Sequence, residues 1–258
     1  MPVASGLYYF ANQADHPTRP PVILIHGAGG NSLYWPPQIR RLPNQRIFAV
    51  DLPGHGRSEG LGHHTIDDYA DGILEFIKAL KLNGAVLVGH SMGSAIALSA
   101  AIRFPERVIG LGLVGGGAKL RVAPSILQSA SNPSTFANAV RMVTEFSFAP
   151  QTGERLKELT AQRMSGTRPP VLHGDFLACD AFNAMDQLSK ISTPTLVLCG
   201  GGDQMTPPRY SEFLRDHIAG AHMEVIADAG HMVMLEQPEK VAGILDGFLN
   251  TISYQPGQ

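Results

Sequence analysis

Cysteine is scarce in this chain of 258 residues, which contains only Cys179 and Cys199. Two cysteines do not make the disulfide framework on which small secreted scaffolds depend. Both lie among apolar neighbours, a setting typical of buried thiols. The fold must therefore be held together by an ordinary apolar core.

Strong charge and long apolar runs are lacking as well. The formal net charge is −2, and no polybasic run is present, which argues against nucleic acid and acidic membranes as partners. No apolar run approaches the length that spans a bilayer, and the first residues lack the basic and apolar segments of a signal peptide. We expect a cytoplasmic protein that acts on a small-molecule substrate, with no membrane partner; the sequence assigns no oligomeric state.

Signatures of cofactor and metal binding are missing too. The run Gly27-Ala28-Gly29-Gly30 does not have the G-x-G-x-x-G spacing of a dinucleotide site. The adjacent His63 and His64 point apart and lack the accompanying spacing of a metal site. We expect no cofactor and no metal.

Buried strands alternating with helical patterns are abundant. Apolar runs at residues 22–25, 47–50, 86–88, 108–114 and 195–199 are separated by stretches of helical spacing. This alternation predicts an α/β fold with a mostly parallel, doubly wound sheet covered on both faces. The rhythm breaks at residues 119–188, which show helical patterns and many Phe and Met residues. We expect a core domain formed by residues 1–118 and 189–258, with residues 119–188 inserted as a helical cap.

A G-x-S-x-G sequence stands between one of these strands and the following helix. It reads Gly89-His90-Ser91-Met92-Gly93. A strand that turns sharply into a helix forces the serine into a strained backbone conformation and lifts its hydroxyl clear of the sheet edge. We interpret Ser91 as a catalytic nucleophile.

A serine nucleophile needs a base that is itself oriented by a carboxylate. Asp203 and His231 each follow a late strand, where the carboxyl ends of a parallel sheet gather functional groups. Asp228 is too near His231 in the same loop to orient it easily. A further position for the acid, after the strand that ends at Val114, reads Gly115-Gly116-Gly117 and offers no carboxylate. We also expect these three glycines to leave room beside Ser91.

These residues resemble the α/β-hydrolase-fold superfamily, in particular its serine carboxylesterase-like members with a helical cap. The matching pieces are His26-Gly27-x-Gly29, Asp51-x-Pro53-Gly54-His55-Gly56-x-Ser58, the sequence around Ser91, Gly202-Asp203, and Gly230-His231 with Glu236-x-Pro238. The resemblance implies Ser91 as nucleophile, His231 as base and Asp203 as the group that orients it. It also implies an oxyanion hole made by the backbone N–H groups of Ala28 and Met92.

The substrate expected from this pattern is a small to medium, largely uncharged carboxylic ester, cleaved through an acyl-enzyme. The candidates for substrate binding are Trp35, Phe146, Phe182 and Met232. Two alternatives stay open: a carbon–carbon bond hydrolase or lyase with the same triad, and a slow-turnover signalling protein that senses a ligand. A cation for a substrate carboxylate would favour the first alternative, and five arginines of the insertion are available: Arg121, Arg141, Arg155, Arg163 and Arg168.

Overall fold

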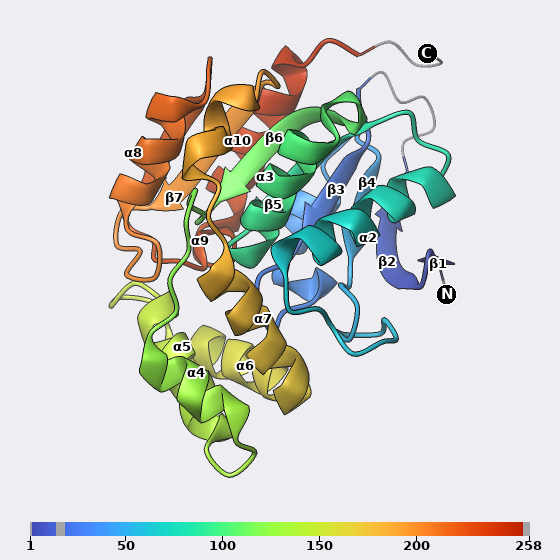
Figure 1. Cartoon of the computed structure of the whole chain (residues 1–258). Helices are drawn as coiled ribbons and strands as arrows, with labels where there is room; N and C mark the ends of the chain where they lie inside the picture. The colour runs from blue at the N-terminus through green and yellow to red at the C-terminus, as the bar shows by residue number, and fades with distance from the viewer. Residues whose placement is uncertain (1, 14–18, 255–258) are drawn as a thin grey trace.

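The computed structural model describes residues 2–13 and 19–254. Its strands form one eight-stranded sheet in the order β1-β2-β4-β3-β5-β6-β7-β8 (Figure 1). The pairs β1–β2 and β2–β4 are antiparallel, and all later neighbours are parallel. The strands are β1 (Val3–Ala4), β2 (Leu7–Asn12), β3 (Val22–Ile25), β4 (Ile47–Val50), β5 (Ala85–His90), β6 (Val108–Val114), β7 (Thr195–Gly200) and β8 (His222–Ile226). The structure confirms the predicted α/β fold with a mostly parallel sheet.

Helices follow most strands, as parallel connections require. The helices are α1 (Pro37–Arg40), α2 (Ile66–Ala79), α3 (Met92–Arg103), α4 (Pro124–Ser131), α5 (Phe136–Ser147), α6 (Glu154–Ser165), α7 (Pro169–Ala181), α8 (Pro208–His217), α9 (Val233–Glu236) and α10 (Pro238–Thr251). Short 3-10 turns are η1 (Ser32–Tyr34), η2 (Pro105–Arg107) and η3 (Met185–Lys190). Across the described part of the chain, no helix combines the length and apolar character that crossing a membrane requires.

The unbroken apolar strands supply both faces of the sheet, because successive side chains point to opposite sides. In β3, Ile23 and Ile25 belong to a core cluster with residues of α2, α3 and α8. Val22 and Leu24, the alternate positions, belong to a second cluster with residues of α1 and α10. A strand that is apolar at every position is thus explained by burial between two helical layers.

Helix α2 shows how local chemistry fixes the start of an element. Thr65 caps the helix, and its hydroxyl accepts a hydrogen bond of 3.1 Å from the amide of Asp68. Asp67 and Asp68 add negative charge in the first turn, where the helix dipole favours it. The buried face of α2 contains Tyr69 and Ile73, so one side of the helix packs against the sheet.

The insertion between β6 and β7 forms a small helical body of its own. Helices α4 to α7 lie together beyond one end of the sheet (Figure 1) and share an apolar cluster separate from the two sheet clusters. The chain leaves and returns through adjacent backbone: Lys119 pairs with Asn183, and the amide of Ala184 donates to the carbonyl of Ala118 over 2.7 Å. The division into a core and a cap at residues 119–188 stays a prediction consistent with this arrangement.

Candidate active site

Ser91 stands at the junction of β5 and α3 in a backbone conformation that side chains rarely adopt. Its φ is 54° and its ψ is −117°. The turn is held through the backbone of Ser91. Its amide donates a hydrogen bond to the carbonyl of Val114, and its carbonyl accepts hydrogen bonds from the amide and the hydroxyl of Ser94. The hydroxyl of Ser91 has no part in these bonds, so the turn presents it for chemistry.

The glycines on either side of Ser91 make this turn possible. A Cβ at Gly89 would overlap the carbonyl oxygen of Gly93, and a Cβ at Gly93 would overlap that of Ile25. Both clashes are with backbone and cannot be relieved by a rotamer change. Only glycine fits at the two positions, which explains the G-x-S-x-G pattern in steric terms.

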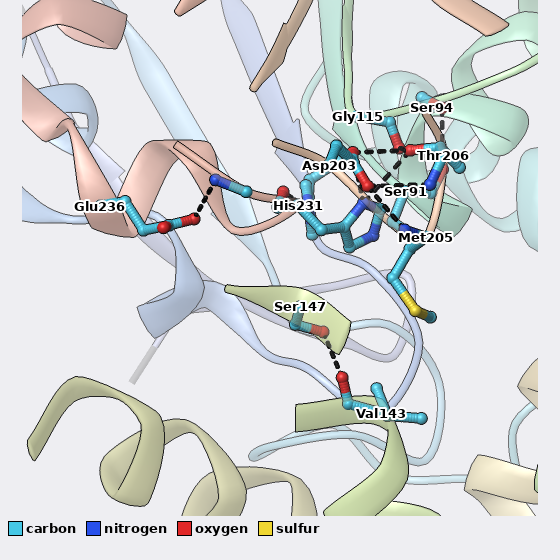
Figure 2. A network of polar contacts seen from close by, with 12 residues as sticks. Ser91, Ser94, Gly115, Val143, Ser147, Asp203, Met205, Thr206, His231 and Glu236 are labelled. Carbon is cyan, nitrogen blue, oxygen red and sulfur yellow. Dashed lines mark hydrogen bonds and ion pairs between the residues drawn. The ribbon is translucent and has the colours of Figure 1, made fainter. Parts of the chain in front are cut away.

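His231 and Asp203 form a buried pair next to this turn. His231 Nδ1 lies 2.9 Å from Asp203 Oδ2, and both side chains are almost fully buried (Figure 2). Asp203 follows β7 and His231 follows β8. Neighbouring parallel strands therefore deliver the two side chains to the same edge of the sheet, as the sequence predicts.

The carboxylate of Asp203 is held by more than the imidazole. Oδ1 accepts hydrogen bonds of 2.8 Å from the amides of Met205 and Thr206, and Oδ2 accepts one of 2.8 Å from the Thr206 hydroxyl. Burial opposes ionisation, but the charge of His231 and the hydrogen bonds outweigh it, so the pKa of Asp203 is lowered. Asp203 is thus an ionised carboxylate with a fixed orientation.

Three residues to which sequence reasoning gave no role, His90, Glu236 and Ser147, position the loop that carries His231. His90, the residue before Ser91, has its Nε2 3.0 Å from the carbonyl oxygen of His231. Glu236 accepts a hydrogen bond of 2.8 Å from the amide of Gly230 (Figure 2) and one of 2.9 Å from Ala149 of the insertion. The carbonyl of Ser147, the last residue of α5, accepts one of 3.0 Å from the Met232 amide. His90 and Glu236 lie within motifs that the sequence shows, whereas Ser147 lies in none.

Ser91 and His231 line the same cavity, which has a volume of about 320 Å³. Ala28 and Thr206 also line it from the core of the fold, and the rest of the wall comes mainly from residues 120–126 and helices α5 and α7. The apolar side chains of the wall include Leu120, Ile126, Met142, Phe146 and Phe176. A volume of this size suits a small ligand.

Of the four expected substrate-binding residues, Phe146 lines this cavity. Trp35 is fully buried in the cluster beneath α1 and α10, and Met232 packs into the same cluster. Phe182 lines a different cavity of about 520 Å³, beside α2 and α3. Among the described residues, Trp35, Phe182 and Met232 are thus not part of the wall around Ser91. Aromatic character alone does not tell which side of a helix or loop faces a cavity.

The three glycines after β6 do not leave open space beside Ser91, contrary to expectation. A Cβ at Gly116 would overlap the hydroxyl of Ser94, and one at Gly117 would lie 2.8 Å from the ring of Tyr210. Gly115 has a φ of 54° and packs against the imidazole of His231. The missing side chains make room for neighbouring protein groups rather than for substrate.

One arginine of the insertion lines the cavity. Arg121 lies at its wall and also lines a neighbouring hollow with Lys119 and Arg209. Arg141 and Arg155 pair with glutamates on their own helices, at 3.6 Å in each case. Arg163 and Arg168 donate to backbone carbonyls of the core, those of Leu33 and Gly60.

Ala28 and Met92 are the two residues expected to supply the oxyanion hole. Ala28 follows β3 and lines the cavity. Met92 is the first residue of α3, and an amide in the first turn of a helix has no acceptor within the helix. The positive end of the α3 dipole adds to the attraction for negative charge at this point.

Among residues 2–13 and 19–254, no three His, Cys, Asp or Glu side chains are placed to share a metal ion.

Two histidines near the site are buried in their neutral form. Burial and the charge of His55 lower the pKa of His26 to about 4. Burial and the charge of His231 lower the pKa of His90 to about 3. His26 Nε2 accepts a hydrogen bond of 3.0 Å from the Leu52 amide, a role that a protonated nitrogen could not fill.

Because the pKa values of His26 and His90 are lowered from the ordinary value of 6.5, we expect the free energy of unfolding to fall as the pH drops from 6.5 to about 4. In this range the unfolded chain binds protons that the folded chain excludes, so acid favours unfolding by about 1.4 kcal/mol per pH unit for each histidine. Urea denaturation measured across this range checks the slope. His26→Gln should remove about half of it, whereas replacing the exposed His217 by Gln should leave it unchanged. A free energy of unfolding that does not vary with pH would contradict the assignment.

The comparisons with known proteins agree with this geometry. The family described as "Alpha/beta hydrolase family" matches residues 22–244. The chain is 28% identical over 239 residues to 3-oxoadipate enol-lactonase 1 of Acinetobacter baylyi, covering 90% of each chain. It is 29% identical over 267 residues to 2-hydroxymuconate semialdehyde hydrolase of Pseudomonas sp. (strain CF600), covering 96% of this chain and 92% of the relative. Among solved structures, a thermophilic esterase superposes with a TM-score of 0.81 at 32% identity, covering 95% of this chain and 98% of that one.

Proposed function

Because the chain belongs to the alpha/beta hydrolase family, we propose that it hydrolyses a small to medium carboxylic ester through an acyl-enzyme. Ser91 is the nucleophile, His231 the general base and Asp203 the carboxylate that orients the base. The observation that carries the proposal is the bond of 2.9 Å between His231 Nδ1 and Asp203 Oδ2, next to a strained serine that shares a cavity with His231.

In the first half of the reaction, the Ser91 oxygen attacks the ester carbonyl while His231 takes the hydroxyl proton on Nε2. The ionised Asp203 accepts the hydrogen bond from Nδ1–H and stabilises the imidazolium that forms. Collapse of the tetrahedral intermediate breaks the ester C–O bond, and His231 gives its proton to the leaving alcohol. A water then attacks the acyl-enzyme by the same steps and releases the carboxylic acid.

The negative charge on the carbonyl oxygen is stabilised by the backbone N–H groups of Ala28 and Met92. Ala28 shares the cavity with Ser91, and the amide of Met92, the residue after Ser91, lies at the N-terminus of α3. Donors that are already in place for the oxyanion need no reorganisation during the reaction, and each is worth about 3 kcal/mol in enzymes of this kind.

The wall of the cavity supports an ester whose acyl or alcohol part is mainly apolar. Phe146, Met142 and Ile126 line it. The relative from Acinetobacter is named for a lactone, which is an internal ester, and the similar solved structure is an esterase. These names support ester hydrolysis as the reaction.

Arg121 favours a second candidate, hydrolysis of a carbon–carbon bond by the same triad. This side chain lines the cavity and is able to hold a substrate carboxylate. The relative from Pseudomonas is named for a semialdehyde rather than an ester.

A series of substrates separates the two candidates. We expect turnover of neutral p-nitrophenyl esters, with kcat/KM rising about fourfold for each methylene group that becomes buried, until the cavity is full. Measuring kcat/KM from acetate to octanoate, beside a diketone that bears a carboxylate, tests this. A large preference for the diketone would contradict the esterase proposal, and a preference lost in Arg121→Gln would assign its carboxylate to Arg121.

Two phenylalanines provide a matched control for the same series. Phe146→Ala removes part of the cavity wall and should flatten the dependence on chain length. Phe182→Ala removes the same side chain from a different cavity and should leave the dependence unchanged. The reverse pattern would place the substrate elsewhere.

A further inference from the structure

A fully buried carboxylate joins the insertion to the loop that carries Ala28. Asp175 lies on α7, and its side chain is completely buried. Oδ2 accepts a hydrogen bond of 2.8 Å from the amide of Gly29 and lies 2.8 Å from Nε2 of His55; Oδ1 accepts one of 2.6 Å from the hydroxyl of Tyr69. All three partners belong to the part of the chain that precedes the insertion.

His55 is the positive partner of this carboxylate. Its Nδ1 lies 3.0 Å from the carbonyl oxygen of Pro53, an atom that only accepts, and its Nε2 faces Asp175. Both ring nitrogens must therefore donate, which requires the imidazolium form. Burial opposes this charge, but the charge and hydrogen bond of Asp175 outweigh it, and the pKa of His55 is raised. The neighbouring His26 stays neutral, so it does not compete for the same proton.

Gly29 is held by side chains of the insertion at both its amide and its carbonyl. Asp175 accepts from the amide, and the hydroxyl of Thr167 donates to the carbonyl over 3.0 Å. Gly29 has a φ of 63°, and a Cβ at this position would lie 2.7 Å from Leu172 of α7. The peptide group between Ala28 and Gly29 is therefore fixed from the side of the insertion, and the position of the Ala28 amide depends on it.

We propose that Asp175, with His55 as its buried counter-ion, is a positioning residue for the oxyanion hole. It holds the loop of Gly29 so that the Ala28 amide points to the developing oxyanion. The inference rests on the proposed function, because it requires an acyl transfer at Ser91. It assigns to the insertion a role in the chemical step, besides forming the wall of the cavity.

A positioning role and a purely structural role predict different kinetic effects. A displaced Ala28 amide weakens binding of the oxyanion more than binding of the neutral ester. Loss of Asp175 should therefore lower kcat and leave KM nearly unchanged. Loss of a contact that only stabilises the fold would lower the melting temperature and leave kcat unchanged for the folded protein.

Asp175→Leu, which keeps a side chain of similar size but removes both acceptor oxygens, tests the proposal in the full-length chain. We expect kcat for a p-nitrophenyl ester to fall by about 10- to 100-fold with KM within about threefold, because misplacing one oxyanion donor is less severe than removing it. The affinity for a trifluoromethyl ketone, which forms an oxyanion on adding to Ser91, should fall by a similar factor. Tyr69→Phe is the matched control: it removes one bond to Asp175 but keeps those from Gly29 and His55. It should lower the melting temperature and leave kcat within about twofold.

Thr167→Val decides the question should Asp175→Leu fail to fold. Valine has nearly the shape of threonine, and the change removes only the hydrogen bond to the Gly29 carbonyl. We expect a decrease in kcat of about three- to tenfold, with KM unchanged. A folded Asp175→Leu protein with the kcat of the wild type, or a wild-type kcat for Thr167→Val when Asp175→Leu does not fold, would overturn the inference alone. Wild-type protein whose Ser91 does not react with the ketone or the esters would overturn the proposed function and the inference with it.

Discussion

Ser91→Ala is expected to lower kcat/KM for every ester substrate by about 10⁵- to 10⁶-fold, the scale on which removal of the nucleophile acts in serine hydrolases. The fold should survive, because Ser91 holds the turn between β5 and α3 through its backbone amide and carbonyl. Alanine retains both groups and tolerates the φ of 54° no worse than serine does. The residual rate would come from the oxyanion hole and from substrate binding.

Hydrolysis of a p-nitrophenyl ester and mass spectrometry after treatment with a fluorophosphonate measure this effect. The wild-type chain should gain the mass of one phosphonyl group, and the Ser91→Ala chain should gain none. Ser99→Ala serves as the control on the same helix, because the Ser99 hydroxyl bonds to Asp67 and does not line the cavity. Ser91→Ala protein with wild-type turnover would refute the assignment of the nucleophile.

Asp203→Asn is expected to lower kcat by about 10³- to 10⁴-fold. The amides of Met205 and Thr206 both point to Oδ1 and need an acceptor there, so the carbonyl oxygen of the new side chain must occupy that position. The NH₂ group then faces His231 Nδ1, which must accept instead of donating. The ring proton moves to Nε2, and the nitrogen that faces the nucleophile is no longer able to take a proton.

The matched control for this variant is Asp228→Asn. Asp228 is the other acidic residue near His231 in the sequence, and it is exposed. We expect its kcat to stay within about twofold of the wild type, because surface substitutions away from the site have small effects. Steady-state kinetics and thermal melts of both variants decide the point. Full activity in Asp203→Asn, or a large loss in Asp228→Asn, would reassign the acid.

The elements that carry the proposed triad could be predicted because each obeys a local rule. Gly89 and Gly93 mark the sharp turn, since no larger residue fits beside the backbone there. Asp203 follows β7 and His231 follows β8, and because these neighbouring strands are parallel, their loops meet at one edge of the sheet. Sequence pattern is informative where backbone geometry alone determines which residue fits at a position or where its loop lies.

The wall of the cavity could not be predicted, because it depends on how helices of the insertion rotate against the sheet. Phe146 and Phe182 are both aromatic residues of the insertion, yet of the two only Phe146 lines the cavity of Ser91. Asp175 left a weak signal that sequence reasoning missed. It shares a helical face with Leu172, Phe176 and Cys179, and an acidic residue on an apolar face requires a buried partner. The sequence does not reveal that this partner is His55, 120 residues earlier.

The short bridge between Lys119 and Asn183 has a consequence for the evolution of this enzyme. Because the insertion begins and ends at one point beside β6, its length and composition are free to vary without a change in the register of the sheet. Selection for a new substrate therefore has wide scope at positions such as Phe146 and Met142. It has little scope at Asp175, since any replacement insertion must again present an acceptor to Gly29. The part of the protein most able to diversify is thus tied to the site at a few fixed hydrogen bonds, among them those of Asp175 and Thr167 to Gly29.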